Sequence, residues 1–200
     1  NVLKGTWVFK LKRLPCGTPY RFQARVCAQG DLQKEGIDFF ETYVPVLLLS
    51  TIRLLLLTVL TEGWSTRQVD YTNAFAQADL KEEVYLEYPR MFGPKSGTNK
   101  VLRLLKSLYE IRQAPCTFFE KLREGLLVLG YHTQSQIDPC LFMKQGIICV
   151  SYVDDTIFAG ADSLVLEAEI QSLGVHEKEQ RQNFALRNEG EVGAFIGIQI

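Results

Sequence analysis

Several features that mark common kinds of functional site are scarce in this chain of 200 residues. It has only two histidines, His132 and His176, which excludes a metal cluster built on histidine ligands. Its five cysteines are an odd number and no pair has the CxxC spacing. The sequence therefore predicts neither a zinc site nor a disulfide framework, and it favours a reducing compartment.

The chain also lacks an apolar run that could cross a bilayer, because its most apolar stretch, residues 44–60, is interrupted by Pro45, Ser50 and Arg53. No signal peptide is visible, and a start at Asn1 instead of Met indicates a chain that begins within a longer protein. We therefore expect no membrane partner. Hydrophobic residues are 46% of the total, which is enough for a buried core and argues against disorder.

Acidic residues are absent from the first thirty positions. The basic residues of this segment are Lys4, Lys10, Lys12, Arg13, Arg21 and Arg25, whereas the remaining 170 residues carry 16 basic and 23 acidic side chains. This asymmetry indicates an anionic ligand near the N-terminal lobe, although a basic hairpin that is merely solvated would give the same pattern.

Apolar periodicity predicts an α+β fold, because helices and strands are mixed without strict alternation. The basic segment predicts a hairpin of residues 6–14 and 20–28 with its basic side chains on one face. Residues 51–62 predict a helix that is apolar nearly all round, hence buried, and that ends at Gly63. Further helices are expected at 72–77, 101–109, 115–129 and 164–173, and further strands at 65–70, 83–88, 138–144, 146–158 and 194–200.

Three carboxylates stand out within this pattern. Two apolar runs flank Asp154 and Asp155, which predicts a hairpin with these two residues as its turn. An ordinary Asp-containing turn is the simpler alternative. Asp70 ends another strand, and if the two strands lie side by side, the three carboxylates converge. Mg²⁺ prefers such hard oxygen ligands, and two ions about 4 Å apart can activate a 3′-hydroxyl and stabilise leaving pyrophosphate.

Seven segments, in order along nearly the whole chain, resemble the reverse transcriptase of copia-type retrotransposons, an RNA-directed DNA polymerase. They are residues 20–30 (YRFQARVCAQG), 40–46 with 51–53 (FETYVPV and TIR), 68–78 (QVDYTNAFAQA), 82–85 (EEVY), 107–115 (SLYEIRQAP), 152–155 (YVDD) and 190–198, the last including Ile196 and Gly197.

The resemblance implies the fingers and palm of a right-hand polymerase, with an antiparallel palm sheet packed on helices and no thumb. Residues 1–64 would form the fingers, with the basic hairpin and the buried helix. Residues 65–90 would form the first part of the palm, and 91–130 a helical segment of fingers and palm. Residues 131–200 would complete the palm with the YVDD hairpin, and the chain would stop before the thumb.

The resemblance also implies a catalytic metal site. Asp70, Asp154 and Asp155 would hold two Mg²⁺ ions, or Mn²⁺ as an alternative, with the backbone carbonyl of Tyr71 as a further ligand. Phe75 stands where the family places an aromatic steric gate that selects deoxynucleotides, although an ordinary core Phe is the alternative.

Three further residues would bind the nucleotide. Arg25 would contact the triphosphate, where a guanidinium gives bidentate hydrogen bonds. Arg112 keeps the charge of a family Lys, and Gln113 lies in the segment that lines the nucleotide and template site. Residues 190–198 would support the primer terminus.

The implied partners are an RNA or DNA template with its primer, deoxynucleoside triphosphates, and the thumb, ribonuclease H and integrase of a Pol polyprotein. The implied location is a cytoplasmic virus-like particle, with the nucleus as an alternative.

Four positions depart from the family pattern. Gln23, Gln29 and Cys116 replace basic residues, and Glu110 replaces a Gly, so each change makes the site more negative by one charge. A decayed, non-catalytic remnant that binds nucleic acid weakly is therefore the alternative to an active polymerase. A metal-dependent nuclease with the same carboxylates is a third hypothesis, which Phe75 and the N-terminal motifs disfavour.

Overall fold

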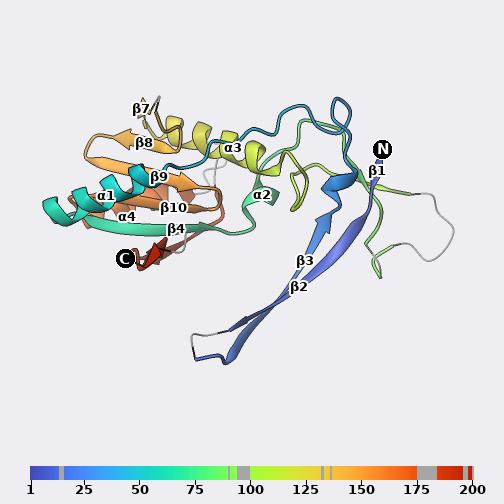
Figure 1. Cartoon of the computed structure of the whole chain (residues 1–200), viewed down its shortest axis with the longest axis horizontal. Helices are drawn as coiled ribbons and strands as arrows, with labels where there is room; N and C mark the ends of the chain where they lie inside the picture. Colours follow the sequence, from blue (N-terminus) through green and yellow to red (C-terminus); the bar gives the residue numbers. More distant parts are fainter. Residues whose placement is uncertain are drawn as a thin grey trace. The chain divides into compact units, whose positions relative to one another are not determined.

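The computed structural model describes residues 1–13, 16–89, 91–93, 100–131, 133–135, 137–174, 184–195 and 198–199, so Ile196 and Gly197 of the last matched segment lie outside it. The chain forms two compact units (Figure 1). Unit 1 comprises Asn1–Tyr43 and Ala78–Thr117, and unit 2 comprises Val44–Gln77 and Phe118–Ile200. Both contain strands and unit 2 contains most of the helical residues, so the fold is α+β as predicted. The assignment of fingers and palm to residue ranges stays a prediction.

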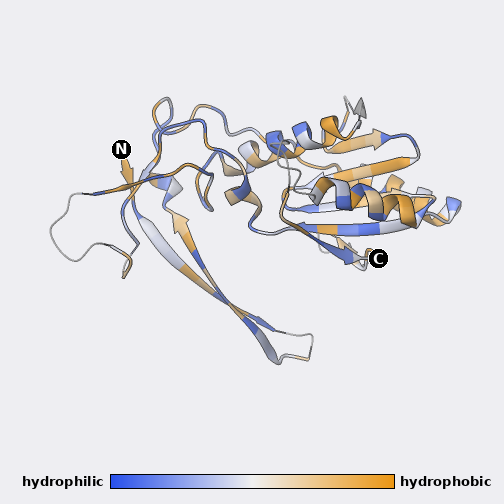
Figure 2. Ribbon diagram, turned by 180° about the vertical axis from the view of Figure 1, so that it is seen from behind, coloured by the Kyte–Doolittle hydropathy of each residue, from blue (hydrophilic) through white to orange (hydrophobic). Residues whose placement is uncertain are grey.

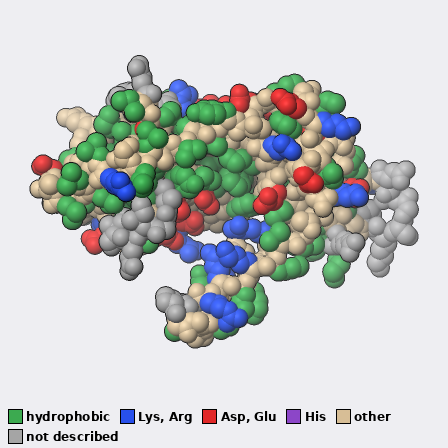
Figure 3. Space-filling model, in the orientation of Figure 1, with side chains coloured by type: hydrophobic (Ala, Val, Ile, Leu, Met, Phe, Trp, Pro, Cys, Tyr) green, Lys and Arg blue, Asp and Glu red, His purple; other side chains and the backbone are tan. Residues whose placement is uncertain are grey.

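The basic hairpin is the main feature of unit 1. It consists of β2 (Gly5–Arg13) and β3 (Pro19–Ala28), which confirms the predicted pair of strands. Directly paired residues of an antiparallel pair share a face. By register, one face carries Lys10, Lys12, Arg21, Gln23 and Arg25. The opposite face carries Trp7, Phe9, Leu11, Phe22, Ala24 and Val26. The expected basic face is therefore present, and Figures 2 and 3 show the alternating hydropathy and the Lys and Arg side chains.

The rest of unit 1 is a small three-stranded sheet and a 3-10 turn. Its elements are β1 (Val2–Leu3), η1 (Gly30–Leu32), β5 (Tyr85–Leu86) and β6 (Leu102–Arg103), and the strand order is β1-β5-β6. The predicted helix over residues 101–109 is wrong. Its backbone donors are taken by a neighbouring segment instead, since Leu104 N–H donates to Val84 O at 2.9 Å and Ser107 N–H to Ala78 O at 2.9 Å. Tertiary pairing has overridden helix propensity here.

Unit 2 is built on a six-stranded antiparallel sheet with the order β11-β4-β10-β9-β8-β7. Its strands are β4 (Ser65–Tyr71), β7 (Thr133–Gln134), β8 (Leu141–Lys144), β9 (Ile147–Tyr152), β10 (Asp155–Gly160) and β11 (Leu186–Gly190). Strand β11 was not predicted, because its sequence LRNEG has no apolar alternation and becomes a strand only through pairing with β4. The predicted last strand is instead two short paired strands, β12 (Ala194–Phe195) and β13 (Ile198–Gln199).

Helices cover both faces of this sheet. The helices α3 (Ala114–Val128) and α4 (Ser163–Gly174) lie on one face, where the ring of Phe118 is 5.3 Å from that of Tyr71, and Leu166 approaches Gly160. Helix α1 (Leu49–Glu62) packs on the other face, through a core cluster that includes Val150 and Ile157. None of the helices in the described ranges is long and apolar enough to cross a membrane.

Helix α1 ends as predicted, at Gly63 with φ 64°, but its predicted burial is wrong. Only Ile52 and Leu55 are buried, whereas the exposed fractions of Leu54, Leu57 and Leu60 are 64%, 57% and 80%. The described part of unit 2 offers this helix one sheet surface, so only one side of the cylinder is covered.

Candidate active site

Three carboxylates gather at one end of the unit 2 sheet. Asp70 on β4 is the register partner of Asp155 on β10, so the two side chains emerge on the same face. Asp154 precedes Asp155 in the tight turn between β9 and β10, and Tyr71 N–H donates to Asp154 O at 3.3 Å. The register therefore confirms that the strand of Asp70 lies beside the strand that follows the turn, whereas the use of the three carboxylates as a metal site stays a prediction. We call Asp70, Asp154 and Asp155 the carboxylate cluster.

The turn itself lies one residue earlier than predicted. Tyr152 pairs with Asp155, so Val153 and Asp154 form the turn and Asp155 belongs to β10. Val153 has φ 55°, a left-handed conformation that is unfavourable for a β-branched residue. A positive φ at the first turn residue suits the right-handed twist of paired strands, which explains why the hairpin closes here. Such local strain is characteristic of functional sites.

Burial and crowding raise the pKa of Asp155 to about 6, from an ordinary value of 3.8. Desolvation is the largest cause, and the nearby charges of Asp154, Asp70 and Glu189 add to it, while a hydrogen bond with Gln68 acts in the opposite direction. The protein groups around Asp155 therefore do not fully compensate its negative charge. A bound cation would stabilise the ionised carboxylate.

This raised pKa predicts a pH-dependent stability. The folded state binds a proton more tightly than the unfolded chain, so the contribution of Asp155 to the free energy of unfolding falls as pH rises from about 4 to about 6. We expect Asp155→Asn to be more stable than the wild type at pH 7.5 in EDTA, with the difference shrinking toward pH 4.5. Urea unfolding at both pH values measures this, with Asp162→Asn as the control. A difference that does not change with pH would contradict it.

The donor chemistry of the carboxylate cluster suits Mg²⁺, since its ligands are hard oxygens. Within the described ranges, however, no three His, Cys, Asp or Glu side chains are arranged around a common point. Ligation would therefore need rotation of the side chains toward one another, which the shared face of Asp70 and Asp155 allows.

Two aromatic residues follow Asp70. Tyr71 is 2% exposed and packs on Phe118 and Phe184 on the face opposite the carboxylates, so only its backbone is available to a ligand there. Phe75, in the short helix α2 (Ala74–Gln77), is half-buried, with its ring 6.4 Å from that of Phe118. Both predicted roles of Phe75, gate and core residue, stay open.

The remaining predicted nucleotide ligands belong to unit 1. The guanidinium of Arg25 lies 4.5 Å from the ring centroid of Tyr109, and Arg112 Nε donates to Gly30 O at 3.1 Å. Gln113 is 2% exposed, with its amide donating to Asp38 O at 2.9 Å and accepting from Gln33 at 2.9 Å. A direct contact of Gln113 with nucleotide would break these bonds. The predicted contact of Arg25 with a triphosphate stays a prediction.

Glu110 occupies an exposed bend, in a conformation that suits glycine. Its φ is 70°, and its carbonyl oxygen lies where it would clash with a Cβ on residue 30, so Gly30 has to be a glycine. No ion pair joins Glu110 to Arg25 or Arg112 in the described part of the chain. The carboxylate of Glu110 therefore does not neutralise the positive charge of Arg25 or Arg112, the two residues predicted to bind phosphate. The backbone of Glu110 is nevertheless strained, because a positive φ is unfavourable for a residue other than glycine.

Comparison with known proteins decides the family. A family model described as "Reverse transcriptase (RNA-dependent DNA polymerase)" matches residues 2–200. The chain belongs to this family. The retrovirus-related Pol polyprotein from transposon RE1 of Arabidopsis thaliana is 34% identical over 197 residues, which cover 96% of this chain and 13% of that polyprotein. The Pol polyprotein from transposon TNT 1-94 of Nicotiana tabacum is 31% identical over 203 residues, covering 99% of this chain and 15% of that polyprotein.

A more distant relative is the transposon Ty1-ER2 Gag-Pol polyprotein of Saccharomyces cerevisiae, 29% identical over 168 residues and 81% of this chain. These matches confirm the predicted copia-type reverse transcriptase. The chain spans 13% to 15% of the length of the two plant relatives.

The site residues predicted from the sequence did not include two charged residues that lie beside the carboxylate cluster. Arg187 on β11 is the register partner of Asp70, and Glu189, next to a register shift in the same strand, contributes to the raised pKa of Asp155. The signal that could have found them is the position of β11 beside β4, which no local pattern encodes.

Proposed function

We propose that this chain adds deoxynucleotides to the 3′ end of a primer as directed by an RNA or DNA template, with release of pyrophosphate. The observation that supports it best is the register that joins Asp70 to Asp155 beside the YVDD turn. Asp70, Asp154 and Asp155 would hold two Mg²⁺ ions, with Mn²⁺ as an alternative. When bound, such ions activate the attacking hydroxyl and stabilise the leaving group.

Within this proposal, the other residues orient the substrate. Arg25 and Arg112 bind the triphosphate of the incoming deoxynucleotide, Phe75 excludes a 2′-hydroxyl, and the Tyr71 carbonyl lies at the metal site. Gln113 acts indirectly, by fixing the segment that carries Arg112. In a right-hand polymerase, most of unit 1 would correspond to the fingers and most of unit 2 to the palm.

A decayed remnant that binds nucleic acid weakly is the second candidate, because Glu110 combines a carboxylate with a left-handed φ of 70° in the predicted nucleotide-binding bend. If the chain acts within a Pol polyprotein, a thumb, ribonuclease H and integrase would be its partners, in a cytoplasmic virus-like particle or in the nucleus.

Substitution of Phe75 tests the polymerase proposal. We expect wild type to extend oligo-dT on poly-rA with dTTP and to reject UTP, and Phe75→Ala to incorporate UTP at least about tenfold better relative to dTTP, since the steric clash is removed. The readout is the ratio of kcat/KM for the two nucleotides. Phe75→Tyr keeps the ring and should keep the discrimination. Unchanged discrimination in Phe75→Ala, with extension intact, would show that Phe75 is only a core residue.

A further inference from the structure

Helix α1 carries an apolar face that the described part of the chain leaves largely uncovered. Its inner side packs on the sheet through Ile52 and Leu55, whereas Leu54, Leu57 and Leu60 are exposed. These three leucines recur every three residues, so they form a stripe along the outer side of the helix with Leu57 at its centre. Contiguous exposed apolar surface of this kind marks interaction sites. Further exposed apolar residues lie at the N-terminal end of the helix: Val46, Leu48 and Leu49.

The hydroxyl groups beside the leucine stripe do not oppose its burial. The Thr58 hydroxyl donates to Leu54 O at 3.0 Å, and the Thr61 hydroxyl donates to Leu57 O at 2.9 Å. Each hydroxyl therefore has a hydrogen-bond partner within the helix and would keep it if water were excluded. A partner that covers the stripe gains apolar burial without leaving these groups unsatisfied.

The charges of α1 indicate which partner fits the stripe. The charged residues of the helix are Arg53 and Glu62, which lie four residues before and five residues after Leu57. A second copy that packs antiparallel, with the two Leu57 side chains in contact, places Leu54 of each copy against Leu60 of the other. It also brings Arg53 of each copy to the C-terminal end of the other helix, where Glu62 and the helix dipole are negative. A parallel pair would place like charges together.

We propose that the leucine stripe of α1 is a dimerisation surface, on which a second copy of this chain docks antiparallel with Leu57 on the two-fold axis. Such an isologous contact uses the same surface on both copies and closes the assembly at two subunits. The leucines supply the hydrophobic burial, and the opposite charges of Arg53 and Glu62 fix the direction. The inference goes beyond the proposed polymerase function and does not depend on it, since none of these residues belongs to the carboxylate cluster.

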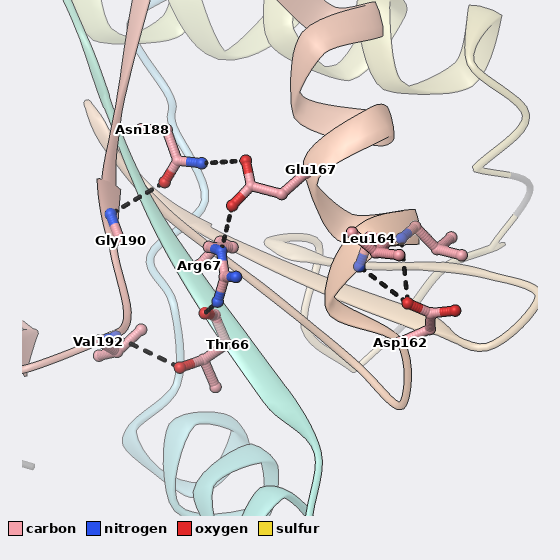
Figure 4. A network of polar contacts seen from close by, with 9 residues as sticks. Thr66, Arg67, Asp162, Leu164, Glu167, Asn188, Gly190 and Val192 are labelled. Carbon is pink, nitrogen blue, oxygen red and sulfur yellow. Dashed lines mark hydrogen bonds and ion pairs between the residues drawn. The ribbon is translucent and has the colours of Figure 1, made fainter.

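Analytical ultracentrifugation of the full chain from about 5 to 500 µM measures the self-association. We expect a monomer–dimer equilibrium in which Leu57→Gln raises the dissociation constant at least about tenfold, because each dimer loses two central side chains. The matched control is Leu164→Gln, which should leave the constant unchanged. Leu164 is 77% exposed at the start of a different helix, α4, where its N–H donates to Asp162 at 2.8 Å (Figure 4).

Reversal of the two charges tests the direction of packing. Arg53→Glu and Glu62→Arg should each raise the dissociation constant severalfold, because like charges then meet at both ends of the helix pair. The double variant Arg53→Glu/Glu62→Arg should restore most of the affinity, since opposite charges meet again. A double variant that is as weak as the sum of the single variants would overturn the antiparallel arrangement.

Disulfide trapping tests the position of the axis. The background is Cys16→Ser, because Cys16 is the exposed cysteine and the other four are buried. In this background Leu57→Cys should form a covalent dimer on mild oxidation, since a residue on the axis faces its own copy. Leu54→Cys should not, because its two copies would lie about 9 Å apart along the helix direction, farther than a disulfide can span.

A wild type that sediments as a monomer at every concentration would overturn the proposal and leave the stripe to a different partner. A dimer that Leu57→Gln does not weaken would also overturn it, because the contact would then lie elsewhere. Equal cross-linking of Leu57→Cys and Leu54→Cys would exclude an axis at Leu57. Each of these results leaves the proposed polymerase function standing, because primer extension is measured separately.

Discussion

Primer extension should fall by roughly a thousandfold or more in Asp154→Asn and in Asp155→Asn, a loss of about 4 kcal/mol in transition-state stabilisation. Each substitution keeps side-chain size and removes one negative oxygen ligand at the end of the sheet. Because Asp155 is destabilising when ionised, its Asn variant should remain folded, so the loss would report chemistry.

The matched control is Asp162→Asn. Asp162 accepts a hydrogen bond from Leu164 N–H at 2.8 Å at the start of α4, and Asn caps helices about as well. This variant should extend primers at the wild-type rate. Activity that survives in both cluster variants at saturating Mg²⁺ would remove Asp154 and Asp155 from the chemistry.

Glu110→Gly should raise deoxynucleotide incorporation at least about tenfold, equivalent to about 1.4 kcal/mol. Two physical effects contribute. The variant loses a carboxylate near the predicted phosphate ligands, and it relieves a left-handed φ of 70° that costs a non-glycine residue about 1 kcal/mol. The free energy of unfolding should rise by a similar amount, apart from the entropy that Gly adds to the unfolded chain.

Glu110→Ala separates the two effects, because it removes the carboxylate and keeps the Cβ. We expect Glu110→Ala to recover part of the activity without the gain in stability. Urea unfolding and single-nucleotide incorporation of wild type and both variants make the comparison. Equal activity of wild type and Glu110→Gly would show that this bend tolerates Glu and that the departure from the family is neutral.

Features of the fold that depend on residues close together in the sequence could be predicted. Alternation located β2 and β3, and the glycine at position 63 located the end of α1. Residues 101–109 failed because their apolar spacing suits a helix as well as a strand, and the partner segment at 78–86 decided between them.

The same distinction between local patterns and distant strand pairing applies to the residues of the candidate site. The three aspartates were found through apolar strands and a family motif, and the sheet register then joined Asp70 to Asp155. Arg187 and Glu189 were missed because β11 is polar and pairs with a strand more than a hundred residues earlier. The one-residue shift of the turn depended on Val153 accepting a positive φ, which sequence preference argues against.

The most direct measurement is extension of labelled oligo-dT on poly-rA by the wild-type chain, with dTTP and Mg²⁺. The account predicts template-dependent addition that disappears in EDTA, without poly-rA and in Asp154→Asn. The contradicting result is a folded wild type that binds the primer–template but adds no nucleotide, together with a Glu110→Gly variant that is equally inactive, because the carboxylate cluster would then lack polymerase activity even with the strained bend repaired.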